Sequence, residues 1–241
     1  MASPVPVSRR PDFTLADFVL AVATGFVGVF VAALLLSPGA EPATLLVGSL
    51  LGQYAGHLIG LRMVVRRRGS SFGALGLHVE PSDGLYLFGG VALQIAVAAA
   101  FIPVAELIGA EGSNQALAEQ IPTIEGTLLR AGLVLSVALI APVTEEVMFR
   151  GLLPRVLRRW MGWTWAYVLA AFVFAVFHLL GVTGGSLRQS LLLLVPQLFL
   201  VGLILGWQAR KRRRLGTAIF IHSGFNLVAV LALLFAPEAF A

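Results

Sequence analysis

Long apolar stretches fill most of the chain, and short polar segments separate them. A transmembrane helix needs roughly 20 apolar residues to cross the ~30 Å hydrocarbon core of a bilayer. The pattern predicts seven such helices, over Leu15–Leu36, Thr44–Val65, Gly84–Val104, Thr127–Val143, Thr164–Leu180, Ser190–Trp207 and Gly216–Phe235. The chain has no internal repeat and no low-complexity segment, so we expect a single integral membrane domain, residues 1–241. The expected fold class is all-α, a polytopic bundle of about seven transmembrane helices.

Composition agrees with a membrane protein and excludes a soluble one. The chain is 58% hydrophobic and 12% charged, with a mean hydropathy of +0.91. Soluble domains are nearer 45–50% apolar and about 25% charged. Because the chain contains no cysteine, disulfides, cysteine-ligated zinc and iron–sulfur clusters are also excluded.

The basic residues predict how the chain is oriented in the membrane. Lys and Arg accumulate in cytoplasmic loops. With the N-terminus in the cytoplasm and the C-terminus outside, the main basic runs all fall on the cytoplasmic side: Arg9–Arg10, Arg66–Arg68, Arg158–Arg159 and Arg210–Arg214. The stretch after Arg10 is too long for the apolar region of a signal peptide, so we interpret it as a retained span. The positive-inside pattern and the short loops favour a prokaryotic plasma membrane.

The basic runs also indicate which partners to expect. They lie between apolar stretches, so the net charge of +5 does not indicate nucleic acid, and we expect no nucleic acid partner. The lipid bilayer is the expected partner. We interpret Arg210–Arg214 first as a topological signal and a contact for anionic lipid.

The end of the fourth stretch carries the most unusual polar cluster. Ionisable groups inside membrane spans are costly and are functional candidates by default. The run from Thr127 to Arg159 is predicted to be one long helix, kinked near Pro142. Glu146 and Arg150 are four residues apart with the acid first, which is the favourable helical pairing. Taken alone, this cluster also fits a structural ion-pair network at the membrane surface.

Helical hairpins are expected to bring further polar side chains to the same depth. If the chain turns near Met161–Gly162, Glu145 and His178 lie at matching heights on antiparallel helices. His222 lies about eight residues past the last basic run, roughly 12 Å up its helix. Asn226 follows it by four residues and shares its face. A lone intramembrane histidine is more often a packing residue, and we place His57 in that class, but the coincidence of depth favours a site.

These side chains permit peptide-bond hydrolysis by activated water. A Glu beside a His can hold water and act as a general base. A second His with an Asn offers donors to the oxyanion that forms on a peptide carbonyl. The same carboxylate and imidazoles also suit a divalent ion such as zinc, held by Glu145, His178 and His222. The chain has neither the H-E-x-x-H spacing of common zinc proteases nor a G-x-S-G serine signature.

The polar residues form three short motifs in a fixed order: Glu145-Glu146-x-x-x-Arg150, Phe174-x-x-x-His178 and His222-x-x-x-Asn226. In type, spacing and order they resemble the motifs of the CPBP family, the CAAX-protease and bacteriocin-processing membrane proteins typified by Ras-converting enzyme. The motif-bearing core is about residues 127–236, whereas the N-terminal third resembles the family only in having apolar spans.

The resemblance implies an intramembrane endopeptidase whose active site opens to the cytoplasmic leaflet. It also implies a catalytic set of Glu145, Glu146, His178, His222 and Asn226, with Arg150 and Phe174 as supporting residues. In this set Glu145 activates water with His178, His222 and Asn226 stabilise the oxyanion, and Glu146 and Arg150 support Glu145. In the eukaryotic branch the substrate is a prenylated CAAX tail, and members are often described as metalloproteases. The expected substrate is therefore a prenylated or other membrane-associated peptide.

Two other functions remain open from the sequence. A non-catalytic membrane scaffold, or an immunity-type protein of bacteriocin systems, could keep the same polar cluster for partner binding. A transporter that uses the Glu and His residues for protons is the third alternative, although such proteins usually contain inverted repeats.

Overall fold

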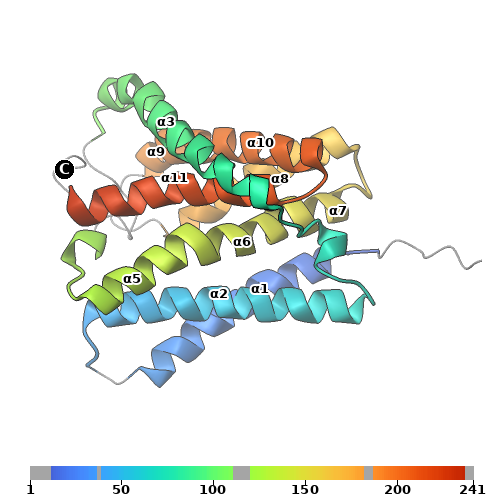
Figure 1. Cartoon of the computed structure of the whole chain (residues 1–241), viewed down its shortest axis with the longest axis horizontal. Coiled ribbons are helices and arrows are strands. Elements are labelled where there is room, and N and C mark those ends of the chain that lie inside the picture. The colour runs from blue at the N-terminus through green and yellow to red at the C-terminus, as the bar shows by residue number, and fades with distance from the viewer. Residues whose placement is uncertain (1–11, 37–38, 111–119, 182–186, 237–241) are drawn as a thin grey trace, which may run out of the picture.

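The computed structural model describes residues 12–36, 39–110, 120–181 and 187–236, and within these ranges it is helical, with no strand. Figure 1 shows the helices as one bundle. In chain order the elements are α1 (Leu15–Leu35), α2 (Pro42–Arg67), η1 (Gly73–Leu75), η2 (Pro81–Leu85), α3 (Tyr86–Ile108), η3 (Ile121–Thr123), α5 (Thr127–Leu135), η4 (Ser136–Ile140), α6 (Ala141–Glu146), η5 (Val147–Leu152), α7 (Leu153–Leu157), α8 (Trp163–Phe177), η6 (His178–Gly181), α9 (Leu187–Gln189), η7 (Ser190–Leu194), α10 (Val195–Arg212) and α11 (Gly216–Phe235).

Among the described residues, seven continuous helical stretches are long and apolar enough to cross a membrane, which confirms the predicted fold class. They coincide with the seven predicted spans, although several run further. The second extends to Arg67 and the sixth to Arg212. Long basic side chains can keep their charged ends in water while their stems cover apolar surface, so such a helix continues past its apolar part.

The basic turns of the described chain lie at one end of the bundle. In Figure 1 the end of α2, the end of α7 and the turn from α10 to α11 are all on the right. This is the arrangement that the positive-inside interpretation requires, but which side of a membrane this end faces stays a prediction. The predicted signals Arg9 and Arg10 lie outside the described residues.

Glycines let two pairs of helices approach very closely. A Cβ atom at Gly28 of α1 would lie 2.0 Å from the carbonyl oxygen of Gly52 on α2. On the other side of the bundle, a Cβ at Gly90 of α3 would lie 1.9 Å from the carbonyl oxygen of Ile221 on α11. Small residues at such contacts are the usual way for transmembrane helices to pack. The second contact fixes α11, which carries two of the predicted site residues.

In the part of the chain that the structure describes, three π-helical segments interrupt the long helices, and each comes just before a proline. Segments η4, η5 and η7 precede Pro142, Pro154 and Pro196 by two residues each. Proline has no N–H, and its ring clashes with the carbonyl four residues earlier, which in all three cases lies within the π segment. The wider turn relieves that clash and leaves carbonyls outside the regular ladder. The expected disturbance near Pro142 therefore takes the form of the π turn η4.

His57 is a packing residue, as expected. It is buried, and its Nδ1 donates to the carbonyl oxygen of Ala21 on α1 at 2.8 Å. The imidazole fills the space opposite Gly25, where an added Cβ would lie 2.0 Å from the ring.

Candidate active site

A cavity of about 340 Å³ lies inside the bundle, and most of the predicted site residues line it. Its walls come from helices far apart in the sequence, with α11 contributing the longest run. The lining residues are Tyr54, Gln94, Ile121, Val137, Ala141, Glu145, Phe174, His178, Leu194, Gln197, Leu198, Val201, His222, Phe225, Asn226, Ala229, Val230 and Leu233. The side chains of Glu145, His178, His222 and Asn226 are therefore brought to one space, as the depth argument predicted.

Glu146 is completely buried and links two of the motifs. Its Oε1 accepts a hydrogen bond from Arg150 Nη1 at 2.9 Å and another from His222 Nδ1 at 2.9 Å. The pairing of Glu146 with Arg150 was expected from their helical spacing and is present. Glu146 therefore supports the imidazole of His222 directly. Its support of Glu145 is indirect, because the His222 imidazole lies between the two carboxylates.

Arg150 is also buried and is held on two further sides. Its guanidinium carbon lies 4.3 Å from the centre of the Phe174 ring. Its Nη2 reaches the carbonyl oxygen of Gly202 on α10 at 3.5 Å. A cation over an aromatic face is stabilised most where water is excluded. Phe174 thus contributes to the site by packing against the cation.

Glu145 is the more accessible of the two acids, with 15% of its side chain exposed. Its Oε1 accepts a hydrogen bond from the Tyr54 hydroxyl of α2 at 3.2 Å. Its Oε2 lies 3.7 Å from His222 Nε2, a distance that leaves room for adjustment or for a bridging water. Among the polar groups of this network, Glu145 is the one placed to meet a substrate.

His178 is oriented by its own helix. Its Nδ1 donates to the carbonyl oxygen of Phe174 at 2.8 Å, which leaves Nε2 as the free ring nitrogen. The Phe174 ring lies edge-on to both imidazoles, with centroid distances of 4.6 Å to His178 and 5.8 Å to His222. One buried phenyl ring therefore sets the position of both histidines and of the Arg150 cation.

Asn226 depends on the π turn of the long helix. Its Nδ2 donates to the carbonyl oxygen of Val137 at 2.9 Å, and Val137 lies within η4. Because a carbonyl only accepts, this contact places the amide nitrogen toward Val137. The Asn226 amide carries a second N–H that this contact does not use.

A bound metal ion would need several donor side chains around one point. Within the described ranges there is no group of three or more His, Asp or Glu side chains placed to hold a metal ion. In this arrangement Glu145, His178 and His222 do not form the expected ligand set. A divalent metal stays a prediction, and no chemical step below is routed through one.

Three polar residues of the cavity lining, Tyr54, Gln94 and Gln197, were not among the predicted site residues. Tyr54 received no role at all, because a single tyrosine in an apolar span does not differ from a packing residue. Gln94 and Gln197 also line the cavity. The only available signal was that each is a polar group in the middle of a predicted span.

The fold and the cavity define a polytopic membrane protein with a buried cluster of Glu, His, Arg and Asn between its helices. Residues 127–228 match the family described as type II CAAX prenyl endopeptidase Rce1-like. This segment is an Rce1-like domain, and the resemblance to the CAAX proteases is confirmed. The family is a peptidase family, so the chain is in general terms an intramembrane protease.

The matched segment runs from α5 into α11 and includes all three motifs. No curated protein and no solved structure matches the chain in the corresponding searches.

Proposed function

We propose that the protein is an endopeptidase that hydrolyses a peptide bond with water activated by Glu145 and His178. The observation that carries this proposal is the convergence of Glu145, His178, His222 and Asn226 on one cavity, although they come from three separate motifs. A packing role would not require the free groups of all four to face the same space.

The hydrogen bonds indicate what each group can offer. His222 donates a hydrogen bond from its Nδ1–H to Glu146, because a carboxylate oxygen can only accept. Its Nε2 becomes a donor when the ring carries a second proton. The buried group of Glu145, Glu146, Arg150 and His222 would then have no net charge, which is the least costly arrangement where water is excluded.

The reaction follows from these roles. A water held between Glu145 and His178 Nε2 loses a proton to the Glu145 carboxylate while its oxygen attacks the carbonyl carbon of the substrate. The new C–O bond converts the carbonyl oxygen to an oxyanion, which accepts hydrogen bonds from His222 Nε2 and Asn226 Nδ2. Glu145 then passes the proton to the leaving nitrogen as the C–N bond breaks, leaving an acid and an amine.

Tyr54 is proposed as a positioning residue for this sequence. Its hydroxyl donates to Glu145 Oε1, so it holds the carboxylate in one orientation and leaves Oε2 for the water. The side chain lies on α2, outside the matched Rce1-like segment.

The lining of the cavity also supports a proposal for the substrate class. Beyond the polar end, its wall is formed largely by aliphatic side chains such as Leu194, Leu198, Val230 and Leu233. We propose that the substrate is a membrane-associated peptide with an apolar group beside the cleaved bond. A prenylated CAAX-type tail is one such peptide, and the site would open to the cytoplasmic leaflet of a prokaryotic plasma membrane.

The test compares wild type with Glu145→Gln, which keeps the shape but cannot take a proton. Both are expressed at matched levels in a host that lacks the gene, and the protein termini of the membrane fraction are catalogued. Glu106→Gln, an exposed position on α3, is the matched control. We expect new termini in wild type and control but not in Glu145→Gln. Identical catalogues from three folded proteins would favour a scaffold function instead.

A further inference from the structure

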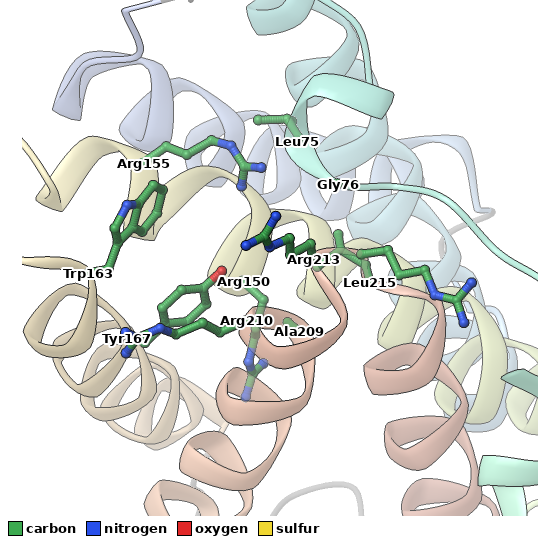
Figure 2. A pocket seen from close by; sticks show the side chains of 11 residues that line it. Leu75, Gly76, Arg150, Arg155, Trp163, Tyr167, Ala209, Arg210, Arg213 and Leu215 are labelled. Atoms are coloured by element: carbon green, nitrogen blue, oxygen red, sulfur yellow. The ribbon is translucent and has the colours of Figure 1, made fainter.

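A second cavity, of about 550 Å³, lies at the basic end of the bundle. Figure 2 shows that it is bordered by the end of the long fourth helix, the start of α8, and the turn from α10 to α11. Its described lining is Leu75, Gly76, Arg150, Arg155, Trp163, Tyr167, Ala209, Arg210, Arg213, Arg214 and Leu215. We call it the arginine pocket, because these lining residues include five arginines and neither Asp nor Glu.

Two of the five arginines already have acidic partners. Arg150 is paired with Glu146 in the active site. Arg214 donates through Nη2 to Asp83 at 2.8 Å and also pairs with Glu80. Because their charges are compensated, these two arginines stabilise the fold and contribute little to the attraction of an anion.

The other three arginines, Arg155, Arg210 and Arg213, have no carboxylate within 4.0 Å in the described part of the chain. Arg155 donates to the carbonyl oxygen of Gly151, and Arg210 donates to the Thr164 hydroxyl at 2.8 Å. Hydrogen bonds to neutral acceptors leave three positive charges uncompensated around one cavity. Figure 2 shows the guanidinium ends of Arg155 and Arg213 and the hydroxyl end of Tyr167 turned toward the same space.

The wall of the arginine pocket is firmly held. The backbone N–H of Leu215 donates to the carbonyl oxygen of Gly76 at 2.8 Å, which joins the segment after η1 to the start of α11. Asp83, fully buried, accepts from Thr217 at 2.8 Å and so anchors η2 to the same helix. The pocket is therefore part of the packed fold.

Arg213 reaches the pocket from an unusual backbone conformation. It directly follows the last residue of α10, with φ of 56°, and among the described residues it is the only one other than glycine with positive φ. Glycine or asparagine normally occupies such a position, because a larger side chain is strained there. A long charged side chain at this point is directed to the cavity.

We propose that the arginine pocket binds a phosphate group through Arg155, Arg210 and Arg213. Guanidinium groups bind phosphate oxygens with two parallel hydrogen bonds, and three of them match the several oxygens of one phosphate. The Tyr167 hydroxyl adds a neutral donor. This chemistry is shared by the headgroup of an anionic phospholipid and by a soluble phosphate. The proposal does not depend on the protease mechanism.

The location of the pocket allows a lipid to reach it. Trp163 and Tyr167 stack with ring centroids 6.1 Å apart at the start of α8, and the Arg158 guanidinium carbon lies 4.8 Å from the centre of the Trp163 ring. Trp and Tyr gather at the headgroup level of membranes, where basic residues attract anionic lipid.

The test uses native mass spectrometry of the full chain in detergent, with phosphatidylglycerol as the anionic probe and phosphatidylcholine as the reference lipid. The pocket variant is Arg155→Gln/Arg210→Gln/Arg213→Gln. The control is Arg62→Gln/Arg66→Gln/Arg67→Gln, which removes the same charge from exposed positions of α2. We expect one tightly bound phosphatidylglycerol per chain. The pocket variant should lose about tenfold or more in affinity, and the control less than about twofold.

A second arm identifies the source of the phosphate. Pyrophosphate that binds in detergent and displaces the lipid indicates a soluble ligand, whereas binding of phosphatidylglycerol alone indicates a headgroup site. Equal losses in the two triple variants would mean general charge attraction and would overturn the proposal, as would the absence of one-to-one binding by either probe. If the pocket variant does not fold, the single change Arg213→Gln at an exposed position gives the same comparison against Arg66→Gln.

Discussion

Replacing Arg150 by Met tests the buried network that connects the three motifs. The change keeps a long flexible side chain but removes the charge that compensates Glu146. The Glu146 carboxylate is fully buried, and its Oε2 has no hydrogen-bond partner among the described residues. Removing one member of a buried ion pair typically costs about 3–5 kcal/mol, because the other charge is left without compensation. The lost contact with the Phe174 ring adds about 0.5–2 kcal/mol, which the thioether partly offsets.

We therefore expect Arg150→Met to lower the free energy of unfolding by about 4 kcal/mol. The measurement is unfolding in mixed micelles, followed by tryptophan fluorescence. Arg62→Met, at an exposed position of α2, should stay within about 0.5 kcal/mol of wild type. The double variant Glu146→Gln/Arg150→Met removes both charges and keeps an acceptor for His222 Nδ1.

The double variant separates charge from packing. If the uncompensated charge is the cause, it should recover at least about half of the loss, because neutral pairs can replace buried ion pairs at little cost. The reasoning is refuted if the double variant is as unstable as the single one. It is also refuted if Arg150→Met unfolds at the same denaturant concentration as wild type.

Three further changes test the positioning of the site. Tyr54→Phe removes the hydrogen-bond donor to Glu145, and in a peptide-cleavage assay it should lower kcat about tenfold with unchanged stability. A tenfold rise in KM with unchanged kcat would contradict a positioning role. Asn226→Ala removes an oxyanion donor and should lower kcat about 10²–10³-fold, and full activity would exclude that role. Gly90→Ala forces a Cβ against the α11 backbone and should cost about 1–3 kcal/mol or more, whereas the neighbouring exposed Gly89→Ala should be neutral.

Much of the fold could be predicted because the membrane limits what an apolar stretch can do. Within lipid, a backbone must satisfy its hydrogen bonds internally, so each apolar stretch of sufficient length becomes a helix. The Glu146–Arg150 pair followed equally from helical spacing. The helix ends were less predictable, because Arg67 and Arg212 continue their helices beyond the apolar part.

The contacts inside the site were harder to predict because they depend on rotation about a helix axis. The positions of Glu145 and His222 along their helices predicted a similar depth. Depth does not say which way a side chain points, because adjacent residues such as Glu145 and Glu146 point about 100° apart around the helix axis. Which of the two acids faces which histidine depends on the π turns, and these come from packing around Pro142 and Pro154. For the same reason Tyr54 was missed: its relation to Glu145 spans two helices whose rotation the sequence does not define.

The π turn η4 has a consequence for chain length. A π turn holds one more residue than an α turn, so it can absorb a one-residue deletion while the helix on either side keeps its orientation. Deleting Leu139 within η4 should therefore keep Glu145 facing the cavity and retain part of the activity. Deleting Ser223 within α11, between His222 and Asn226 and with no π turn beside it, should turn Asn226 by about 100° relative to His222 and abolish it. When distant relatives are aligned, a single-residue gap just before the acidic pair is compatible with an intact site.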